Sequence, residues 1–315
     1  MKVLVTGGSG LLGANVVEAL LCQGHEVNVL LRKTSNTIGL SGLKKTVHYG
    51  DLNDEDSIVS AAKGCNWIVH CAANTKQWKT SQGEHDQVNL EGTKNIIESA
   101  GRAGVEKLVF ISTANTFPLS NDNGIQLNSY YVRSKRAAED FVLAQNIVPA
   151  VILNPSFMIG ARDSKPSSGQ AILHYLNNKL VFTPAGGKSF IHVKDVADAV
   201  LSALHLDIEG KRMLLANDNR SYLSFFQLIG KLTNQDKTLI PIPPFISILG
   251  GAFGTLYGKL SGSMPKLNLE NAEIINSNLF YNGDAAYRQL GITKRPLEEA
   301  ILDAVEWFKG NGYCV

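Results

Sequence analysis

Tyr131 and Lys135 carry the clearest chemical pattern in the sequence, because a spacing of four residues places both side chains on one face of a helix. A tyrosine can donate a proton to a developing alkoxide if the pKa of its phenol falls from about 10 toward neutrality. A nearby lysine cation favours the phenolate and therefore lowers that pKa. Ser112-Thr113 ends an expected strand and offers a hydroxyl that could hold a carbonyl against the tyrosine. These residues predict a site for proton transfer to a carbonyl oxygen.

A second pair, Tyr175 and Lys179, has the same spacing. It follows the sixth expected strand, away from the place where we expect the chemistry to occur. We therefore predict that this pair belongs to a solvated helix face and has no catalytic role.

A glycine-rich turn, Thr6-Gly7-Gly8-Ser9-Gly10-Leu11-Leu12-Gly13, separates the first expected strand from the first expected helix. Glycines in this context allow a tight turn, a close approach of the backbone to a pyrophosphate, and close packing of helix on strand. The free N–H groups of the first helical turn then face the anion. The turn predicts a dinucleotide site that includes Gly7, Gly10, Leu11, Leu12 and Gly13.

Arg32 and Lys33 follow the second expected strand, where NAD-specific sites carry an acidic residue for the ribose 2′-hydroxyl. No acidic residue follows them before Asp51. An arginine can instead bind a 2′-phosphate through two hydrogen bonds, and Lys33 or Lys44 could add positive charge. We predict that the protein prefers NADP(H) to NAD(H).

Apolar runs and helical patterns alternate through the first half of the chain. Six strands are expected, at residues 2–5, 26–31, 46–49, 67–71, 107–111 and 150–153. Helices are expected at residues 54–62, with Asn53 as the cap, at 86–103, and at 129–145. This alternation predicts an α/β protein with a Rossmann-type, doubly wound parallel sheet.

The alternation of expected strands and helices ends after Pro155. We expect a dinucleotide-binding domain at residues 1–160 and a smaller C-terminal substrate lobe over most of residues 161–315. The chain should return to the first domain near residues 188–216, through a strand at 190–193 and a helix that follows it.

Composition sets limits on the kind of protein. The chain has 315 residues, a formal net charge of +2 and 44% hydrophobic residues, which gives no reason to expect a nucleic-acid partner. The four cysteines form no pair with metal-ligand spacing, so we expect reduced thiols and no metal site. Because the first strand begins at once, we expect no presequence and a cytoplasmic location.

Residues 238–258 are uncharged, and Gly250, Gly254, Gly258 and Gly262 recur there and just beyond at every fourth position. On a helix these glycines would form one smooth face for close approach of another helix. Prolines at 241, 243 and 244 leave too short an apolar stretch for a membrane span. We favour a helix packed inside the fold. A surface that contacts a membrane or the second subunit of a homodimer is the alternative.

Several motifs resemble those of the extended short-chain dehydrogenase/reductases over nearly the whole chain. Besides the glycine turn and the Tyr131–Lys135 pair, they are Gly50-Asp51-Leu52, His70-Cys71-Ala72-Ala73, the run at 89–95, Ile111-Ser112-Thr113-Ala114, the run at 154–160, and the run at 191–197. The dihydroflavonol-4-reductase-like subgroup, with kinship to 3β-hydroxysteroid dehydrogenases, is the most similar on Arg32, Asn154-Pro155-Ser156 and residues 165–169.

The resemblance implies functional roles by position. Thr113, Tyr131 and Lys135 would form the catalytic group, with Lys135 also binding the cofactor ribose, and Asn89 would take a fourth catalytic position or be structural. The implied cofactor contacts are Asp51 and Leu52 at the adenine, Ala72 and Ala73 along the cofactor, and Pro155, Ser156 and Phe157 near the nicotinamide. The family usually has serine where Thr113 stands, so the neighbouring Ser112 is a second candidate for that hydroxyl.

The resemblance implies an NADPH-preferring oxidoreductase that reduces a ketone or aldehyde on an apolar small molecule, or oxidises the alcohol. The short spacing from Thr113 to Tyr131 argues against a flavonoid substrate. One alternative is a nucleotide-sugar epimerase or dehydratase, which would need cations for a diphosphate, and Arg212, Arg220 and Lys266 are available. Another is a non-catalytic dinucleotide-binding sensor.

Overall fold

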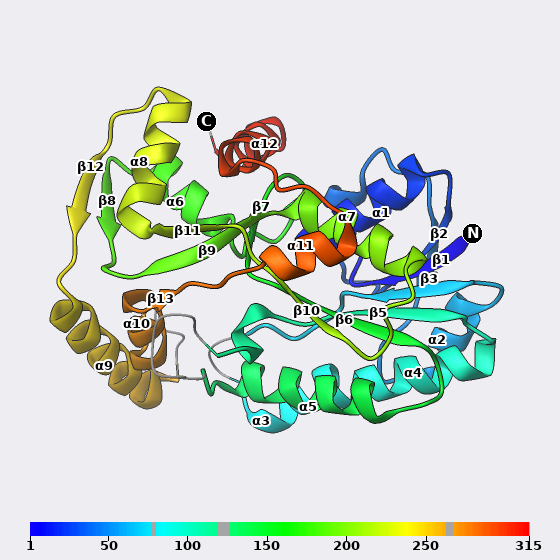
Figure 1. The fold of residues 1–315 in the computed structure, drawn as a ribbon. Helices are drawn as coiled ribbons and strands as arrows, with labels where there is room; N and C mark the ends of the chain where they lie inside the picture. Colours follow the sequence, from blue (N-terminus) through cyan, green and yellow to red (C-terminus); the bar gives the residue numbers. More distant parts are fainter. Residues whose placement is uncertain (77–79, 119–126, 263–266, 315) are drawn as a thin grey trace.

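The computed structural model describes residues 1–76, 80–118, 127–262 and 267–314. Its largest element is a parallel sheet of seven strands in the order β10-β6-β5-β4-β1-β2-β3 (Figure 1). The strands are β1 (Lys2–Thr6), β2 (Glu26–Leu31), β3 (Thr46–Tyr49), β4 (Trp67–His70), β5 (Lys107–Ile111), β6 (Ala150–Pro155) and β10 (Arg212–Leu215). The order reverses between β1 and β4, and ligands of doubly wound sheets bind at such a reversal. The predicted fold class and the six predicted strands are confirmed.

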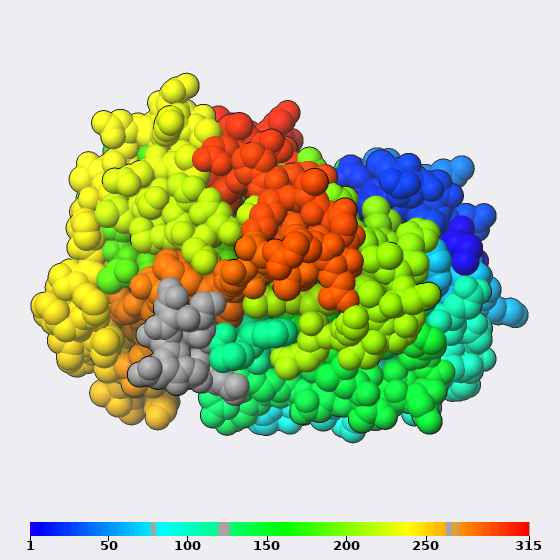
Figure 2. Space-filling model, in the orientation of Figure 1, coloured from blue at the N-terminus to red at the C-terminus, as the bar shows by residue number. Residues whose placement is uncertain are grey.

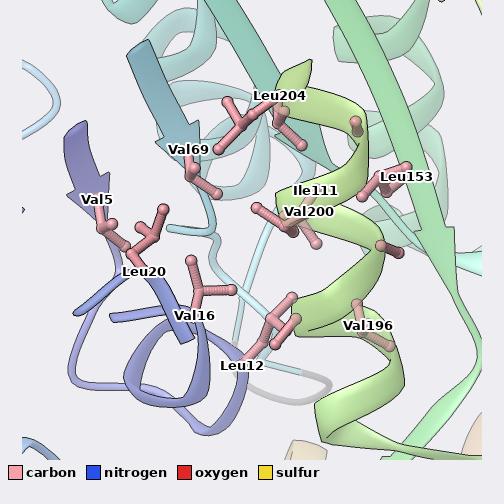
Figure 3. Packing of buried hydrophobic residues seen from close by; sticks show 14 of the residues in the cluster. Val5, Leu12, Val16, Leu20, Val69, Ile111, Leu153, Val196, Val200 and Leu204 are labelled. Atoms are coloured by element: carbon pink, nitrogen blue, oxygen red, sulfur yellow. The ribbon is translucent and has the colours of Figure 1, made fainter. Parts of the chain in front are cut away.

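Helices cover both faces of this sheet. One face carries α1 (Leu11–Cys22), α7 (Val193–His205) and α11 (Asp284–Leu290), and the other carries α2 (Glu55–Ala62), α4 (Gly92–Ala103) and α5 (Tyr130–Ala144). Figure 3 shows Val16 and Leu20 of α1 and Val200 of α7 meeting over the strands. Each such buried side chain contributes about 1.5–3 kcal/mol, so these layers hold the carboxyl edge of the sheet in place.

Two helix starts differ from the sequence-based expectation. The helix expected at residues 86–103 begins earlier, as α3 (Gln82–Asp86), and continues through a π-helical turn, η2 (Gln87–Glu91), into α4. It starts there because Ser81 and Glu84 form a capping box. Helix α2 is capped by the side chain of Asp54, which accepts a hydrogen bond from the Ser57 N–H at 3.2 Å, and not by Asn53.

The smaller lobe is built on a second sheet. It contains β7 (Phe157–Ile159), β9 (Gly187–His192), β11 (Asp218–Ser221) and β13 (Asn278–Leu279), and a separate parallel pair joins β8 (Leu180–Thr183) to β12 (Thr238–Pro241). The helices of this region are α6 (Gln170–Asn177), α8 (Tyr222–Thr233), α9 (Pro244–Ser261), α10 (Leu269–Asn276) and α12 (Leu297–Gly310). Short 3₁₀ turns lie at Ile38–Leu40 (η1) and Ala114–Thr116 (η3).

The strand expected at residues 190–193 does not rejoin the main sheet, which corrects that prediction. It is β9, whose Phe190 stacks on Phe225 in the core of the smaller lobe, with ring centroids 4.3 Å apart. The chain returns to the main sheet one element later, through α7 and then β10, which pairs with β6.

Helix α9 packs on α10 through one face only. Ser247, Gly251 and Gly258 are the buried residues of α9, whereas Gly250 is exposed and Gly262 is the C-cap with a positive φ of 63°. The four glycines therefore do not form one packing face, because the contact with α10 centres on Gly251. Large side chains cover the opposite face, where Phe253 is 70% and Leu260 80% exposed, at an outer corner of the molecule (Figures 1 and 2). Among the residues that the structure describes, no helix combines the length and apolarity needed to cross a membrane.

Candidate active site

The glycine turn lies where the sheet order reverses, between the carboxyl ends of β1 and β4. Gly7 has a positive φ of 68°, and a Cβ there would lie 2.6 Å from the backbone nitrogen of Ala72. A Cβ on Gly13 would lie 2.2 Å from the carbonyl oxygen of Gly7. Both glycines are therefore required by the close packing of the turn itself, and Ala72 is held directly beside it.

Gly10 has a different environment. It is exposed at the N-cap of α1, and a Cβ there would approach no protein atom closer than 3.4 Å. The protein's own packing therefore does not require a glycine at this position, whereas a close-lying ligand would. Leu11 and Leu12 bury their side chains in the core and present the first backbone N–H groups of the helix. This cradle fits the pyrophosphate of a dinucleotide.

Arg32 and Lys33 lie at the same edge of the sheet, directly after β2. Both side chains are exposed, and neither forms an ion pair or hydrogen bond with any other residue in the described part of the chain. Asp51 and Leu52 follow β3. The Asp51 carboxylate accepts hydrogen bonds from Asn53, and the Leu52 carbonyl accepts one from the Asn95 side chain at 2.8 Å.

Thr113 and Tyr131 come together at the end of β5. The Thr113 hydroxyl accepts a hydrogen bond from the Asn115 N–H at 3.3 Å and makes a side-chain hydrogen bond with the Tyr131 phenol. The neighbouring Ser112 hydroxyl is buried and has no partner among the described residues. Of the two candidate hydroxyls, only Thr113 contacts the tyrosine. Burial raises the pKa of Tyr131 to about 12, and the Thr113 hydrogen bond opposes that rise.

Lys135 lies one helical turn after Tyr131 and is buried. Its ammonium donates to the carbonyl oxygen of Ile111 at 2.8 Å and lies 4.0 Å from the centre of the Phe110 ring. Burial lowers the pKa of Lys135 to about 7, although the Glu139 carboxylate acts to raise it. Burial therefore outweighs the expected lowering of the Tyr131 pKa by Lys135, and it shifts the pKa values of both groups toward their neutral forms.

Comparison with known proteins agrees with this geometry. The model of the NAD dependent epimerase/dehydratase family matches residues 3–215. The chain belongs to this family. It is 30% identical to the protein named "Putative dihydroflavonol 4-reductase" of Synechocystis sp., over 98% of this chain and 95% of that protein. It is 36% identical to the 3-beta-hydroxysteroid dehydrogenase of Mycolicibacterium neoaurum over 46% of this chain and 43% of that protein. The crystal structure of gox2253 superposes with a TM-score of 0.83 and 28% identity, covering 100% and 99% of the two chains.

These findings confirm the predicted membership in the extended short-chain dehydrogenase/reductases, with relatives named as dihydroflavonol reductases and 3β-hydroxysteroid dehydrogenases. The protein is thus an enzyme of an NAD(P)-dependent oxidoreductase family, and the sensor hypothesis is not supported. Within the described residues, no group of three or more histidine, cysteine, aspartate or glutamate side chains is placed to hold a metal ion.

Asn89 lies in the π-helical turn η2 and is buried. Its Oδ1 accepts from the Asn74 N–H at 2.7 Å, and its Nδ2 donates to the Asn74 carbonyl at 3.0 Å and to the Ser134 hydroxyl at 2.9 Å. Both amide hydrogens are used within the protein. Asn89 therefore braces the segment after Ala73 against α5, beside Lys135, which favours the structural alternative for this residue.

A buried polar network lies behind Thr113. Glu139 of α5 accepts from the Asn154 side chain at 2.6 Å and pairs with Arg212 of β10 at 2.7 Å. Asn154 also donates to the Thr113 carbonyl at 3.1 Å. Because the buried Glu139 carboxylate has both partners, the network holds in place the backbone that presents the Thr113 hydroxyl.

The second tyrosine–lysine pair is not a solvated helix face. Tyr175 is 2% exposed and donates to the backbone carbonyl of Gln235 at 2.7 Å, whereas Lys179 lies beyond the end of α6 and is exposed. That this pair has no catalytic role stays a prediction. The reason differs from the expected one, because Tyr175 is a core residue packed against α8.

Sequence reasoning missed three polar groups of the site. His85 is fully buried, with neither ring nitrogen bonded, 6.3 Å from the Tyr131 ring. Lys188 and Ser189 of β9 line a cavity of about 120 Å³ together with Thr113, Ser156 and other residues. No local pattern marks these residues, because only the pairing of β9 with β7 brings residues 188 and 189 beside residues 156 and 157.

Proposed function

We propose that this enzyme is an NADPH-preferring oxidoreductase that reduces a ketone or aldehyde on an apolar small molecule, or catalyses the reverse oxidation. The observation that carries the proposal is the hydrogen bond between Thr113 and Tyr131. Thr113 lines a cavity at the edge of the sheet that also carries the glycine turn. A carbonyl oxygen placed between these two hydroxyls would accept hydrogen bonds from both.

When bound, NADP(H) supplies or accepts the hydride. Tyr131 carries the proton that the carbonyl oxygen receives during reduction, and Thr113 orients that oxygen through its own hydroxyl. Lys135 would bind the ribose through its ammonium, which would then donate hydrogen bonds to both the ribose and the Ile111 carbonyl. Gly7 and Gly13 allow the tight packing of the turn, Gly10 would leave room for the pyrophosphate, and Ala72, Ala73 and Pro155 would line the remaining path.

The preference for NADP(H) rests on Arg32 and Lys33. Both are exposed cations at the end of β2, and Lys44 is exposed nearby in sequence. In the described residues no acidic side chain pairs with Arg32, so its guanidinium is available for a 2′-phosphate.

An apolar substrate is favoured over a nucleotide sugar. Of the three cations considered for a diphosphate, Arg212 pairs with Glu139 and Arg220 pairs with Asp218, each at 2.7 Å, while Lys266 lies outside the described residues. Relatives named for a flavonoid precursor and for 3β-hydroxysteroids point to alcohols or ketones on polycyclic apolar molecules. We further propose a cytoplasmic location.

A panel of carbonyl substrates with NADPH, read by NADPH absorbance, tests the proposal. The panel should contain 3-ketosteroids, cyclic ketones, aldehydes and, as the competing class, UDP-glucose with NAD. We expect reduction of at least one apolar ketone or aldehyde. Turnover of UDP-glucose alone would contradict the proposal and favour the epimerase alternative.

A further inference from the structure

Helix α9 turns its large apolar side chains outward and its small residues inward. Its buried residues are Ser247, Gly251 and Gly258, and the helix packs on α10. Six large apolar side chains of the same helix are more than half exposed, and these are Phe245, Leu249, Phe253, Leu256, Tyr257 and Leu260. Scattered apolar side chains are normal on a protein surface, whereas a contiguous apolar patch marks a surface that contacts another molecule or a membrane.

The six exposed side chains form one stripe along α9. They follow one another in steps of three or four residues, so they project from one side of the helix, opposite Gly251 and Gly258. The other side of α9 is held on the protein, where the Asn276 side chain of α10 donates to the Ser247 hydroxyl at 2.7 Å. The stripe therefore points away from the molecule at its outer corner (Figures 1 and 2).

The charge around the stripe has one sign. From residue 237 to residue 269 the sequence contains three lysines and no aspartate or glutamate. Lys237 precedes β12, Lys259 lies exposed in the last turn of α9, and Lys266 lies outside the described residues. Anionic lipid headgroups attract lysines that flank an apolar helix face. An apolar stripe with only positive charge beside it therefore matches a membrane surface that contains anionic lipids.

A second copy of the chain fits the stripe less well. Helix α9 has 18 residues and is therefore about 27 Å long. One side of a single helix of this length offers much less than the area of about 800 Å² that each partner buries in a standard protein interface. Its place at an outer corner suits insertion into a soft lipid surface better than contact with another folded chain (Figure 2).

We propose that α9 docks the enzyme on the surface of a bilayer that contains anionic lipids. The stripe enters the interfacial layer and Lys259 binds headgroups, while α10 covers the other side of the helix, so α9 lies in the surface and does not cross it. The docking helix belongs to the lobe that lines the cavity beside Thr113, because α10 leads into β13 and Leu279 of β13 lines that cavity. The inference goes beyond the proposed function, since docking needs neither cofactor nor turnover.

Flotation of the purified full chain with vesicles tests the docking. The vesicles are phosphatidylcholine alone or phosphatidylcholine mixed with phosphatidylglycerol, and the partition coefficient is measured. We expect the wild type to bind the mixed vesicles more strongly. Phe253→Gln combined with Leu260→Gln should lower the partition coefficient on both kinds of vesicle about tenfold or more, because two apolar side chains no longer enter the lipid. The matched control combines Leu143→Gln with Leu302→Gln, which removes two exposed leucines of α5 and α12, and should bind like the wild type.

Lys259→Gln tests the charge separately from the apolar stripe. It should weaken binding to the mixed vesicles about fivefold, the effect of one lysine at an anionic surface, and leave binding to pure phosphatidylcholine unchanged. An equal loss on both kinds of vesicle, or none on either, would contradict the anionic surface.

A tryptophan placed in the stripe reports insertion in a fully folded protein. Tyr257→Trp is a conservative exchange at an exposed position of α9, and Tyr49→Trp is its control at an equally exposed position of β3, since these tyrosines are 63% and 61% exposed. With brominated lipids in the mixed vesicles, fluorescence beyond that of the wild type should be quenched in Tyr257→Trp and not in Tyr49→Trp. Quenching of neither, or of both alike, would show that α9 does not enter the lipid.

Two further results would overturn the docking surface. One is a wild type that binds neither kind of vesicle, or that binds as strongly after Phe253 and Leu260 are replaced. The other is a wild type that sediments as a dimer without binding vesicles and becomes a monomer in the double variant, which would make the stripe a subunit interface. If the enzyme binds vesicles through α9 but reduces no carbonyl in the panel, docking stands and only the proposed function fails.

Discussion

Tyr131 keeps its proton at neutral pH, since burial raises its pKa to about 12. A phenol in this state can donate to a carbonyl oxygen without any prior change. Lys135, with its pKa lowered to about 7, is only partly charged and is bound to the Ile111 carbonyl. Burial thus shifts the pKa values of both groups toward their neutral forms.

Replacing Tyr131 by phenylalanine should remove the transferred proton and leave cofactor binding intact. General acid–base groups contribute about 10²–10⁴ in rate, so kcat should fall by that factor. The control is Tyr175→Phe, which loses a hydrogen bond to Gln235 worth about 1 kcal/mol of stability but should keep its turnover. Turnover with a substrate from the carbonyl panel and NADPH binding by fluorescence are measured. An inactive Tyr175→Phe beside an active Tyr131→Phe would reverse the assignment.

Arg32→Ala should reduce the preference for NADPH. A charged hydrogen bond to the 2′-phosphate is worth about 1.5–3 kcal/mol, which corresponds to about tenfold or more in affinity. NADH binding should be unaffected, because it has no 2′-phosphate. Fluorescence titration of both cofactors gives the ratio of the two dissociation constants. A ratio that is the same in the variant and the wild type would show that Arg32 does not select the cofactor.

At the scale of elements, helix α9 packs against α10 through a small contact face. A Cβ on Gly251 would lie 2.7 Å from the Asn268 carbonyl oxygen and 2.7 Å from the Ala272 Cβ. The backbone of α10 would have to move, because a carbonyl cannot rotate away as a flexible side chain can. A Cβ on the neighbouring Gly250 would come no closer than 3.8 Å to the Leu267 side chain.

Gly251→Ala should therefore destabilise the protein, while Gly250→Ala should stabilise it. Overpacking costs about 1–3 kcal/mol and outweighs the gain in helix propensity of up to about 1 kcal/mol, which Gly250→Ala obtains without any clash. Urea unfolding of the two variants gives the difference directly. Equal stabilities would mean that α9 and α10 separate without a measurable loss of free energy.

The predictability of the elements follows from their surroundings. Buried parallel strands such as β1 and β5 are continuous apolar runs, so sequence alone locates them. The glycine turn is equally visible, because its chemistry is local. The register of α9 on α10 was not predictable from glycine spacing, since an adjacent position, Gly251, makes the closest contact. Lys188 was not predictable either. Its place in the lining of the cavity depends on the pairing of β9 with the strands at residues 157–159 and 278–279.

At the scale of the whole molecule, residues 161–169 connect the two parts of the chain. Ser164 donates to the Ser9 carbonyl in the glycine turn at 2.8 Å, and the Tyr313 phenol near the C-terminus donates to the Ser164 carbonyl at 2.9 Å. Within this segment the Asp163 carboxylate accepts from the N–H groups of Ser167 and Gly169 at 3.2 and 3.1 Å. This segment therefore bridges the glycine turn and the end of the chain that follows α12.

Asp163 should make the stability of the whole protein depend on pH. Burial raises its pKa from 3.8 to about 6, despite the two hydrogen bonds. Between those values the folded protein retains a proton that the unfolded chain has lost, so the free energy of unfolding falls as pH rises through that window and then levels off. Two pKa units correspond to about 3 kcal/mol. Asp163→Asn keeps an oxygen for both N–H groups and removes the titration.

Urea unfolding of the wild type and Asp163→Asn from pH 4.5 to 8 tests this linkage, because the difference between the two proteins cancels all other titrating groups. The stability of the variant relative to the wild type should rise by about 2 kcal/mol between pH 4.5 and pH 7 and stay constant above it. Asp140→Asn, at an exposed position on α5, serves as the control for removal of one carboxylate. A relative stability that does not change with pH, or that falls, would show that the Asp163 carboxyl ionises as easily in the folded protein as in water. The segment would then have to open around it.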